Sequence, residues 1–279
     1  MALYDQEQHR SLAFHYGGHD PGVCCHMHSA LALWMLGYPA AALERGRVGV
    51  TLARALAHPS SLANALPFLG VVRQLRGEVD AVHELTVSLI DLSAAHGLAQ
   101  WLAFGRILEG WIQAERSHGN ASVAQLRGAV DEYRSKGNDL WLPCFLALLA
   151  AALLKNGALE EGLTTVTGAL AKADETGAHL WDAEFHRLRG ELLLARDPGG
   201  VSQAEAAFQQ ALVIAGGQNA KSWELRAALS LGRLWRRHGK GEEAGRLLRD
   251  IHDWFTEGFD TADLRDARML LDESSTASK

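Results

Sequence analysis

Hydrophobic residues along the chain recur at helical spacing. Between Leu140 and Leu153, apolar side chains fall three or four positions apart, which is typical of the buried stripe of an amphipathic helix. The segment 225–235 shows the same spacing less regularly. Aromatic residues make up only 7% of the chain and there are six prolines, which disfavours a many-stranded β architecture. The pattern predicts an all-α protein.

The helical stripes recur with a period of about 40 residues, the signature of a repeat architecture. Glycine marks the period, and a series of small residues and a series of tryptophans run in step with it. The three series are Gly37, Gly77, Gly119, Gly157, Gly199 and Gly239; Ala30, Gly70, Gly110, Ala150, Gly190 and Gly232; and Trp101, Trp141, Trp181 and Trp223.

Each repeat is predicted to be a helix–turn–helix unit that buries its apolar face only by stacking on its neighbours. Glycine steps such as those at 119, 157 and 239 are expected to end one helix through a left-handed C-cap. Small residues midway along the first helix let its partner approach closely, and the tryptophans are expected to pack in the core. The first helices are expected at 22–36, 60–76, 99–117, 139–156, 179–196 and 219–238, and the second at 39–57, 78–96, 121–136, 158–176, 201–216 and 241–255.

A C-terminal helix at about 262–272 carries a charged face suited to capping a solenoid. The predicted organisation is therefore an N-terminal extension (1–20), a repeat domain (21–257), a capping helix (258–273) and a disordered tail (274–279).

Composition narrows the classes of function. The formal charge of −6 and the pI near 6.1 provide no basic excess for a phosphate backbone, so nucleic acid is not an expected partner. Three cysteines without a secretory signal indicate reduced thiols. No stretch reaches eighteen consecutive apolar residues. We therefore expect a soluble, cytoplasmic protein with no membrane partner.

The turn glycine, the small residue before it and the small residue after it match part of the tetratricopeptide (TPR) pattern, with longer helices. A closer likeness lies in segments that include non-periodic stretches. They are YGGHDPGVCCHMHSALALWMLGYPAAAL (16–43), AHPSSLANAL (57–66), WDAEFHRLRGELLLA (181–195), WELRAALSLGRLW (223–235) and WFTEGFDTADLRDARMLLDE (254–273).

These segments resemble the C-terminal region of bacterial predicted ATPases that often carry an N-terminal class III adenylate or guanylate cyclase domain. The stacked repeats predict a right-handed superhelical solenoid of about six TPR-like helix pairs with a C-terminal capping helix. The resemblance implies a non-catalytic sensor or scaffold, the regulatory part of a signalling ATPase or cyclase system, with nucleotide chemistry located upstream.

By analogy with TPR folds, the first helices are expected to line a concave groove with an apolar middle and a basic end. Such a groove would bind a protein or peptide segment, or a small anionic effector held by arginines. The arginines near the end of the sixth first helix have a second interpretation, a solvated C-terminus favoured by the helix dipole. No cofactor or metal is expected, and a homo-oligomer is left open. The expected groove residues are Phe104, Ile107, Trp111, Cys144, Ala147, Ala151, Glu184, Arg187, Glu191, Arg226, Arg233 and Arg237.

The segment from His15 to His28 is rich in potential ligands and supports an alternative, a helical enzyme or a metal-binding protein. Zinc needs three or four converging N or S donors, and a nucleophilic thiol needs a neighbouring base. Here all the donors lie within fourteen residues, with no second pair elsewhere. The favoured interpretation is a capped turn, with Asp20 as N-cap and Pro21 at the first helical position. The residues of the alternative are His19, Asp20, Cys24 and His28.

A phosphate-binding loop would favour catalysis, and the nearest candidate is AGGQNAKS at 215–222. Ala215 and Ala220 occupy the two positions where the loop needs glycine, and no strand is expected before it. Enzymatic activity is therefore the less favoured hypothesis.

Overall fold

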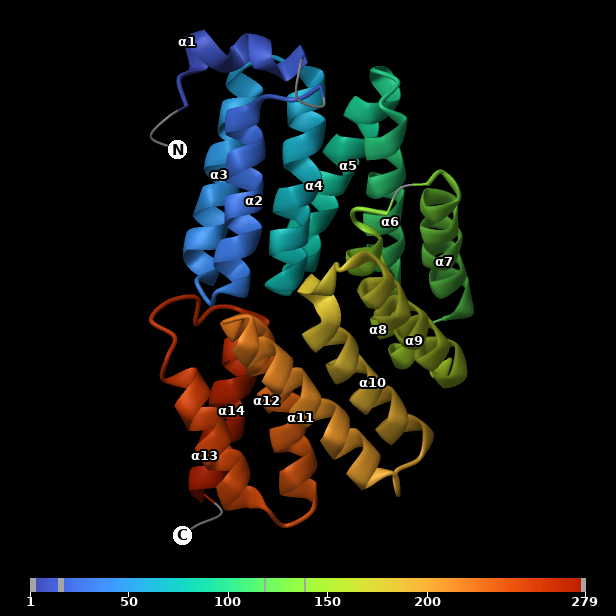
Figure 1. Cartoon of the computed structure of the whole chain (residues 1–279), viewed down its shortest axis with the longest axis vertical. Coiled ribbons are helices and arrows are strands. Elements are labelled where there is room, and N and C mark those ends of the chain that lie inside the picture. Colours follow the sequence, from blue (N-terminus) through green and yellow to red (C-terminus); the bar gives the residue numbers. More distant parts are fainter. Residues whose placement is uncertain (1–3, 15–17, 118, 138, 277–279) are drawn as a thin grey trace. The chain divides into compact units, whose positions relative to one another are not determined.

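The computed structural model describes residues 4–14, 18–117, 119–137 and 139–276. Within these ranges the chain consists of helices joined by turns, with no strand (Figure 1). It forms two compact units, Met1–Trp34 with Tyr38–Gln113, and Met35–Gly37 with Ala114–Lys279. The all-α prediction is confirmed.

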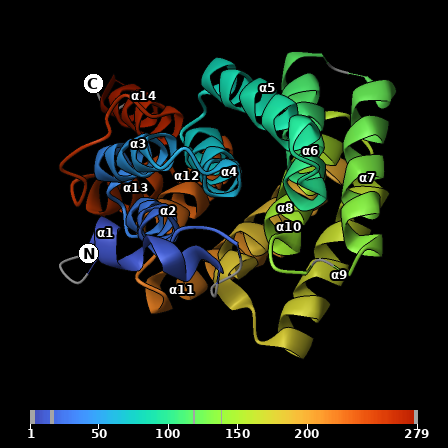
Figure 2. The ribbon, with the colours of Figure 1, turned by 90° about the horizontal axis from the view of Figure 1, so that it is seen from above.

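The first unit begins with the short helices α1 (Gln6–His9) and η1 (Arg10–Phe14). Antiparallel helices follow, and α3 packs against α4 and α4 against α5 (Figures 1 and 2). A proline opens α2, α3 and α4, where its missing N–H is not needed and its fixed φ suits the first turn. The helices are α2 (Pro21–Met35), α3 (Pro39–Ala55), α4 (Pro59–Leu75), α5 (Val79–Ala95) and α6 (Ala99–Arg116), whose last residues belong to the second unit.

The second unit continues the pairs, and α10 packs against α11 as α12 does against α13. Its helices are α7 (Asn120–Ser135), α8 (Leu142–Lys155), α9 (Leu159–Thr176), η2 (His179–Trp181), α10 (Asp182–Arg196), α11 (Val201–Gly217), α12 (Lys221–Arg237), α13 (Gly241–His252) and α14 (Ala262–Thr276). The thirteen helices α2 to α14 match the predicted segments. The last one continues to Thr276, and residues 277–279 lie outside the described ranges.

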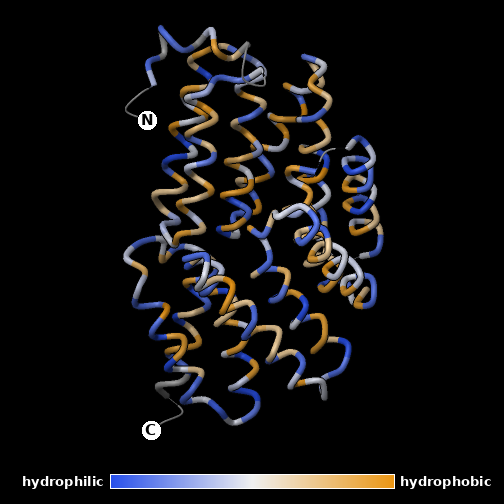
Figure 3. Tube along the Cα trace, viewed as in Figure 1, coloured by the Kyte–Doolittle hydropathy of each residue, from blue (hydrophilic) through white to orange (hydrophobic). Residues whose placement is uncertain are grey.

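Most helices carry both hydrophobic and hydrophilic residues, as a one-sided apolar stripe requires (Figure 3). Helix α8 is apolar along nearly its whole length. Where α12, α13 and α14 meet, the stripes form one buried cluster, which includes Leu229, Leu248 and Leu264. Trp181 and Trp223 are buried with ring centroids 5.2 Å apart, which confirms that these repeating tryptophans belong to the core.

Two series of positive φ angles mark the helix ends. Gly157 and Gly239 end first helices with φ of 75° and 77°, as expected. The same expectation was wrong for Gly119, because this residue is the N-cap of α7 and has an extended φ of 173°. The second series, at the ends of second helices, was not predicted: Ala57, Gly97, Gly137, Gly177 and Asn219.

Candidate functional site

A network of ion pairs joins α10, α12 and α14, which are every second helix along this part of the chain. The carboxylate of Glu184 is buried and accepts two hydrogen bonds of 2.7 Å, from Nε and Nη2 of Arg187. Arg226 of α12 also approaches this carboxylate, with Nη1 3.8 Å from Oε1 of Glu184. Nε of Arg226 also donates to Oδ2 of Asp263 on α14 at 2.8 Å. Acid, base and acid therefore alternate across three helices.

A second set of contacts lies about two turns further along α10 and one turn further along α12. The hydroxyl of Ser230 donates to Oε1 of Glu191 at 2.6 Å. Nη1 of Arg187 is 3.8 Å from the same carboxylate oxygen. Arg187 thus links the two sets of contacts.

Two further arginines of α12 pair with acidic residues of α14. Nη2 of Arg233 lies 2.5 Å from Oδ2 of Asp266, and Nη1 of Arg236 lies 2.7 Å from Oε2 of Glu273. Arg237 is exposed at the end of α12. The sequence predicted a basic end for the groove, but acidic residues of α14 neutralise much of that charge. The result is a surface on which positive and negative charges alternate.

Burial opposes ionisation in this network, and the ion pairs overcome it. Burial acts to raise the pKa of Glu184, but the charge and hydrogen bonds of Arg187, with the charge of Arg226, lower it below its usual range. Burial acts to lower the pKa of Arg187, and the carboxylates of Glu184, Glu191 and Asp263 raise it. Both groups are therefore charged in the folded state at neutral pH.

The apolar residues expected in the middle of the groove are largely buried. Phe104, Ile107 and Trp111 of α6 expose at most 4% of their surface, and Cys144 and Ala147 of α8 at most 5%. Burial raises the pKa of the Cys144 thiol well above its usual range. Ala151 is partly exposed. Ligand contact through the five buried side chains stays a prediction, and in this structure they belong to the core.

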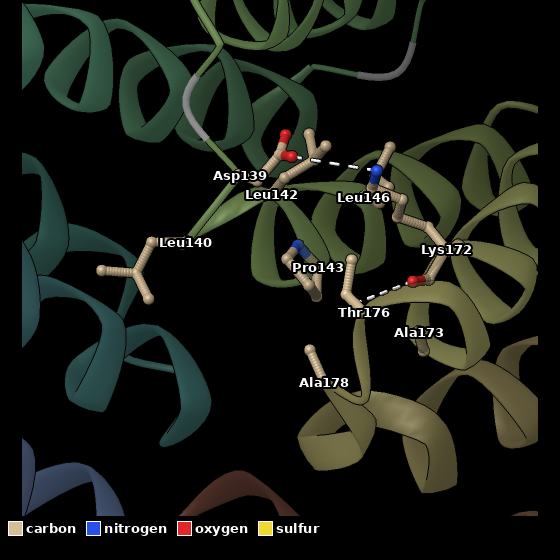
Figure 4. Close-up of a pocket in the computed structure, with 10 residues that line it drawn as sticks. Asp139, Leu140, Leu142, Pro143, Leu146, Lys172, Ala173, Thr176 and Ala178 are labelled. Atoms are coloured by element: carbon tan, nitrogen blue, oxygen red, sulfur yellow. Dashed lines mark hydrogen bonds and ion pairs between the residues drawn. The ribbon is translucent and has the colours of Figure 1, made fainter.

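Two adjoining cavities lie between α7, α8 and α9 and were not anticipated. The larger, about 600 Å³, has charged residues of α7 and α9 at its edge, including Arg127 and Glu161 with Nε and Oε1 2.5 Å apart. The smaller, about 330 Å³, is apolar and lies by the start of α8 and the end of α9 (Figure 4). Both are lined by Asp139, Leu142, Leu146, Ala169 and Lys172.

The N-terminal candidates form local helix-start contacts. Asp20 is buried, its Oδ1 accepts the N–H of Val23 at 3.0 Å, and its Oδ2 accepts the hydroxyl of Tyr4 at 2.9 Å. Nδ1 of His28 lies 3.0 Å from the carbonyl oxygen of Cys24 and 3.5 Å from its sulfur.

Asp20 therefore caps α2, as the structural interpretation expected. His19 is partly buried, and His15 lies outside the described residues. In the described part of the chain, no three His, Cys, Asp or Glu side chains are grouped so that they could hold a metal ion.

The paired helices, their period and their packing define an all-α, TPR-like solenoid. The crystal structure of NprR in complex with its cognate peptide NprX has this fold, with a TM-score of 0.61 and 14% identity over 94% of this chain and 75% of that one. At this identity the likeness shows the fold alone. Within the described ranges, no helix has both the length and the apolar character needed to span a membrane.

Sequence comparison gives a relative without an assigned activity. The chain is 27% identical over 234 residues to the uncharacterized protein R02095 of Rhizobium meliloti (strain 1021). The match covers 84% of this chain and 23% of that protein, so the chain spans about a quarter of its relative. No family model matches. Neither likeness shows an association with an ATPase or a cyclase.

Proposed function

We propose that the chain is a non-catalytic binding module that holds an extended protein or peptide segment along the ion-paired surface of α10, α12 and α14. The observation that carries the proposal is the alternation of fixed charges across successive helices. We call this surface the charged face; it consists of Glu184, Arg187, Glu191, Arg226, Ser230, Arg233, Arg237, Asp263 and Asp266.

The charged face combines immobilised side chains with access to solvent. The side chains of Arg226, Asp263 and Glu191 are 16%, 23% and 29% exposed, and that of Arg233 is 42% exposed. The guanidinium of Arg226 also stacks 5.3 Å from the ring centre of Trp223. Ion pairs already hold these side chains in one rotamer. Binding a ligand therefore costs less side-chain entropy than it would if the side chains were free.

The alternation of sign favours a peptide over a small anion. The guanidinium of Arg233 is 42% exposed and has five N–H donors, more than the carboxylate of Asp266 can accept, so peptide carbonyls can accept some of the others. An extended peptide that carries both positively and negatively charged side chains would complement the alternating charges of the charged face. The likeness to NprR, solved with a peptide, supports the same class of ligand here.

The finer part of the proposal is that peptide binding makes this chain the regulatory part of a signalling ATPase or cyclase system. Its support is the resemblance of the non-periodic segments at 16–43 and 254–273 to such proteins. The alternative, catalysis by His19, Asp20, Cys24 and His28, is weakened by the commitment of Asp20 to capping α2.

A displayed library of random peptides about ten residues long would test the binding role, since extended segments are recognised through successive side-chain contacts. Peptides enriched on the wild type should bind the double variant Arg233→Glu, Arg237→Glu at least about tenfold more weakly, because reversed charges oppose the peptide. The matched control is Arg246→Glu, Arg249→Glu on the exposed side of α13, which has the same net charge. Equal loss in both variants, or no enrichment on the wild type, would contradict the proposal.

The regulatory role needs a separate measurement. An enriched peptide would be added to a cyclase–ATPase relative that carries this helical region, and its nucleotide turnover followed. A peptide-dependent change that disappears with the charged-face variant supports regulation. Turnover indifferent to a bound peptide would restrict the role to that of a scaffold.

A further inference from the structure

We propose that the cavity beside α8 and α9 is a second binding site, which takes a small amphiphilic amine. The apolar body of the ligand would fill the 330 Å³ cavity, and its ammonium group would lie among the carboxylates at the edge. The site is separate from the charged face, and the inference does not depend on the proposed function.

The walls of the cavity are almost entirely apolar. Leu142, Pro143 and Leu146 of α8 face Ala173 of α9 across it, and Leu140 in the preceding turn is 80% exposed beside it (Figure 4). A volume of 330 Å³ is in the range of pockets that hold small organic ligands. A ligand body placed there would cover apolar surface that water now contacts, which favours binding.

The charges at the edge of the cavity are unevenly matched. Nζ of Lys172 lies between two carboxylates, 3.9 Å from Oδ2 of Asp139 and 3.7 Å from Oε2 of Glu175. Both distances exceed those of a direct charge-assisted hydrogen bond, about 2.7–2.9 Å. Two acids therefore share one loosely held base.

The adjoining cavity does not reverse this imbalance. Its edge carries Arg127 with Glu161 and Arg134 with Asp131, two pairs of opposite sign. The local excess is one negative charge, contributed by the group around Lys172. An ammonium ligand would complement it, whereas a carboxylate ligand would be repelled.

Hydrogen-bonding capacity favours a small molecule over a peptide in this cavity. A peptide backbone placed there would give up its hydrogen bonds to water, and such groups need replacement partners when buried. The hydroxyl of Thr176 already donates to the carbonyl of Lys172 at 2.8 Å. A hydrocarbon body needs no such partners.

Titration calorimetry at pH 7 with decylamine, decanol and decanoate tests the proposal on the full chain. The amine and the carboxylate are kept below their micelle concentrations and the alcohol below its solubility limit. We expect decylamine to bind at least tenfold more tightly than decanoate, with decanol between them. The variant Asp139→Asn, Glu175→Gln should weaken decylamine at least fivefold and leave decanol unchanged. Lys172→Ala should tighten decylamine at least twofold, because it removes the competing ammonium.

Two further variants separate the site from unspecific effects. Lys155→Ala is the matched control, since Lys155 has nearly the same exposure as Lys172 and also pairs with a carboxylate, but lies away from the cavity. It should leave all three affinities unchanged. Ala178→Trp, at an exposed position of the lining, should weaken decylamine and decanol alike.

Tighter binding of decanoate than of decylamine would overturn the proposal, as would absence of decylamine binding or insensitivity to the Asp139 and Glu175 changes. If Ala178→Trp does not fold, the variants at Asp139, Glu175 and Lys172 still test whether the amine binds at this cavity. Peptide binding to the charged face is measured independently, so failure of either site leaves the other to be judged on its own.

Discussion

The ring of Phe208 in α11 lies directly against the backbone of Gly190 in α10. A Cβ added at position 190 would stand 2.7 Å from Cδ1 and 2.9 Å from Cζ of this fully buried ring. Gly232 has the same relation to Leu248, whose Cδ1 would be 3.0 Å away. The small residue within the first helix therefore sets how closely the second helix can pack.

Gly190→Ala should destabilise the protein despite the better helix propensity of alanine. Forcing a methyl group against a buried ring costs about 1–3 kcal/mol, and the gain in propensity returns at most about 1 kcal/mol. Gly128→Ala in α7 is the matched control, because nothing lies within 4 Å of the added Cβ and the position is exposed. Denaturant unfolding should show the control slightly stabilised and Gly190→Ala weakened. Equal stabilisation of both would disprove the close-packing argument.

Ala57 adopts a left-handed backbone conformation where three other repeats have glycine. Its φ is 50°, and Gly97, Gly137 and Gly177 follow at steps of 40 residues. Ala57→Gly should raise the free energy of unfolding by about 1 kcal/mol, because an L side chain is strained there. Asn219→Gly, at the equivalent position with φ of 54°, should gain less, since asparagine tolerates this region. Thermal unfolding of both variants gives the comparison, and a loss of stability in Ala57→Gly would refute it.

The sequence predicted what depends on local spacing and missed what depends on side-chain placement. Periodic glycine, alanine and tryptophan located the helices to within about three residues, because those residues are required at each turn and helix crossing. The glycines at 97, 137 and 177 also recur at steps of 40 residues, and this period marks the ends of the second helices. Net charge at Arg226 and Arg233 could not be judged from sequence alone, since their partners come from α14. The cavity was missed because its lining combines side chains of the first helix α8, the second helix α9 and the turns beside them, and their packing is not readable from local spacing.

Native thiol labelling should distinguish the three cysteines. Cys144 is buried, and burial raises its pKa, so its reactive thiolate is scarce near neutral pH. Cys25 is exposed and Cys24 partly so. With iodoacetamide at pH 8, mass spectrometry should find modification at Cys24 and Cys25 well before Cys144, and at all three under denaturing conditions. Early labelling of Cys144 would show that α8 opens readily.

Glu184→Gln should destabilise the protein by about 3 kcal/mol at neutral pH, because it leaves Arg187 and Arg226 partly buried without their shared carboxylate. Glu132→Gln, which breaks an exposed pair with Lys136, should cost less than about 1 kcal/mol. Urea unfolding of both variants at pH 7 measures the difference.

The cost of Glu184→Gln should also depend on pH. Ion pairing lowers the pKa of Glu184 in the folded state below its ordinary value of 4.5, so the unfolded chain binds the proton more readily. The stability that this carboxylate contributes is therefore fully present above pH 4.5 and is lost as the pH falls through the folded-state pKa. Wild type and variant should converge in unfolding free energy on acidification below pH 4.5. A constant difference down to the acid transition would mean that Glu184 is held by packing rather than by its charge.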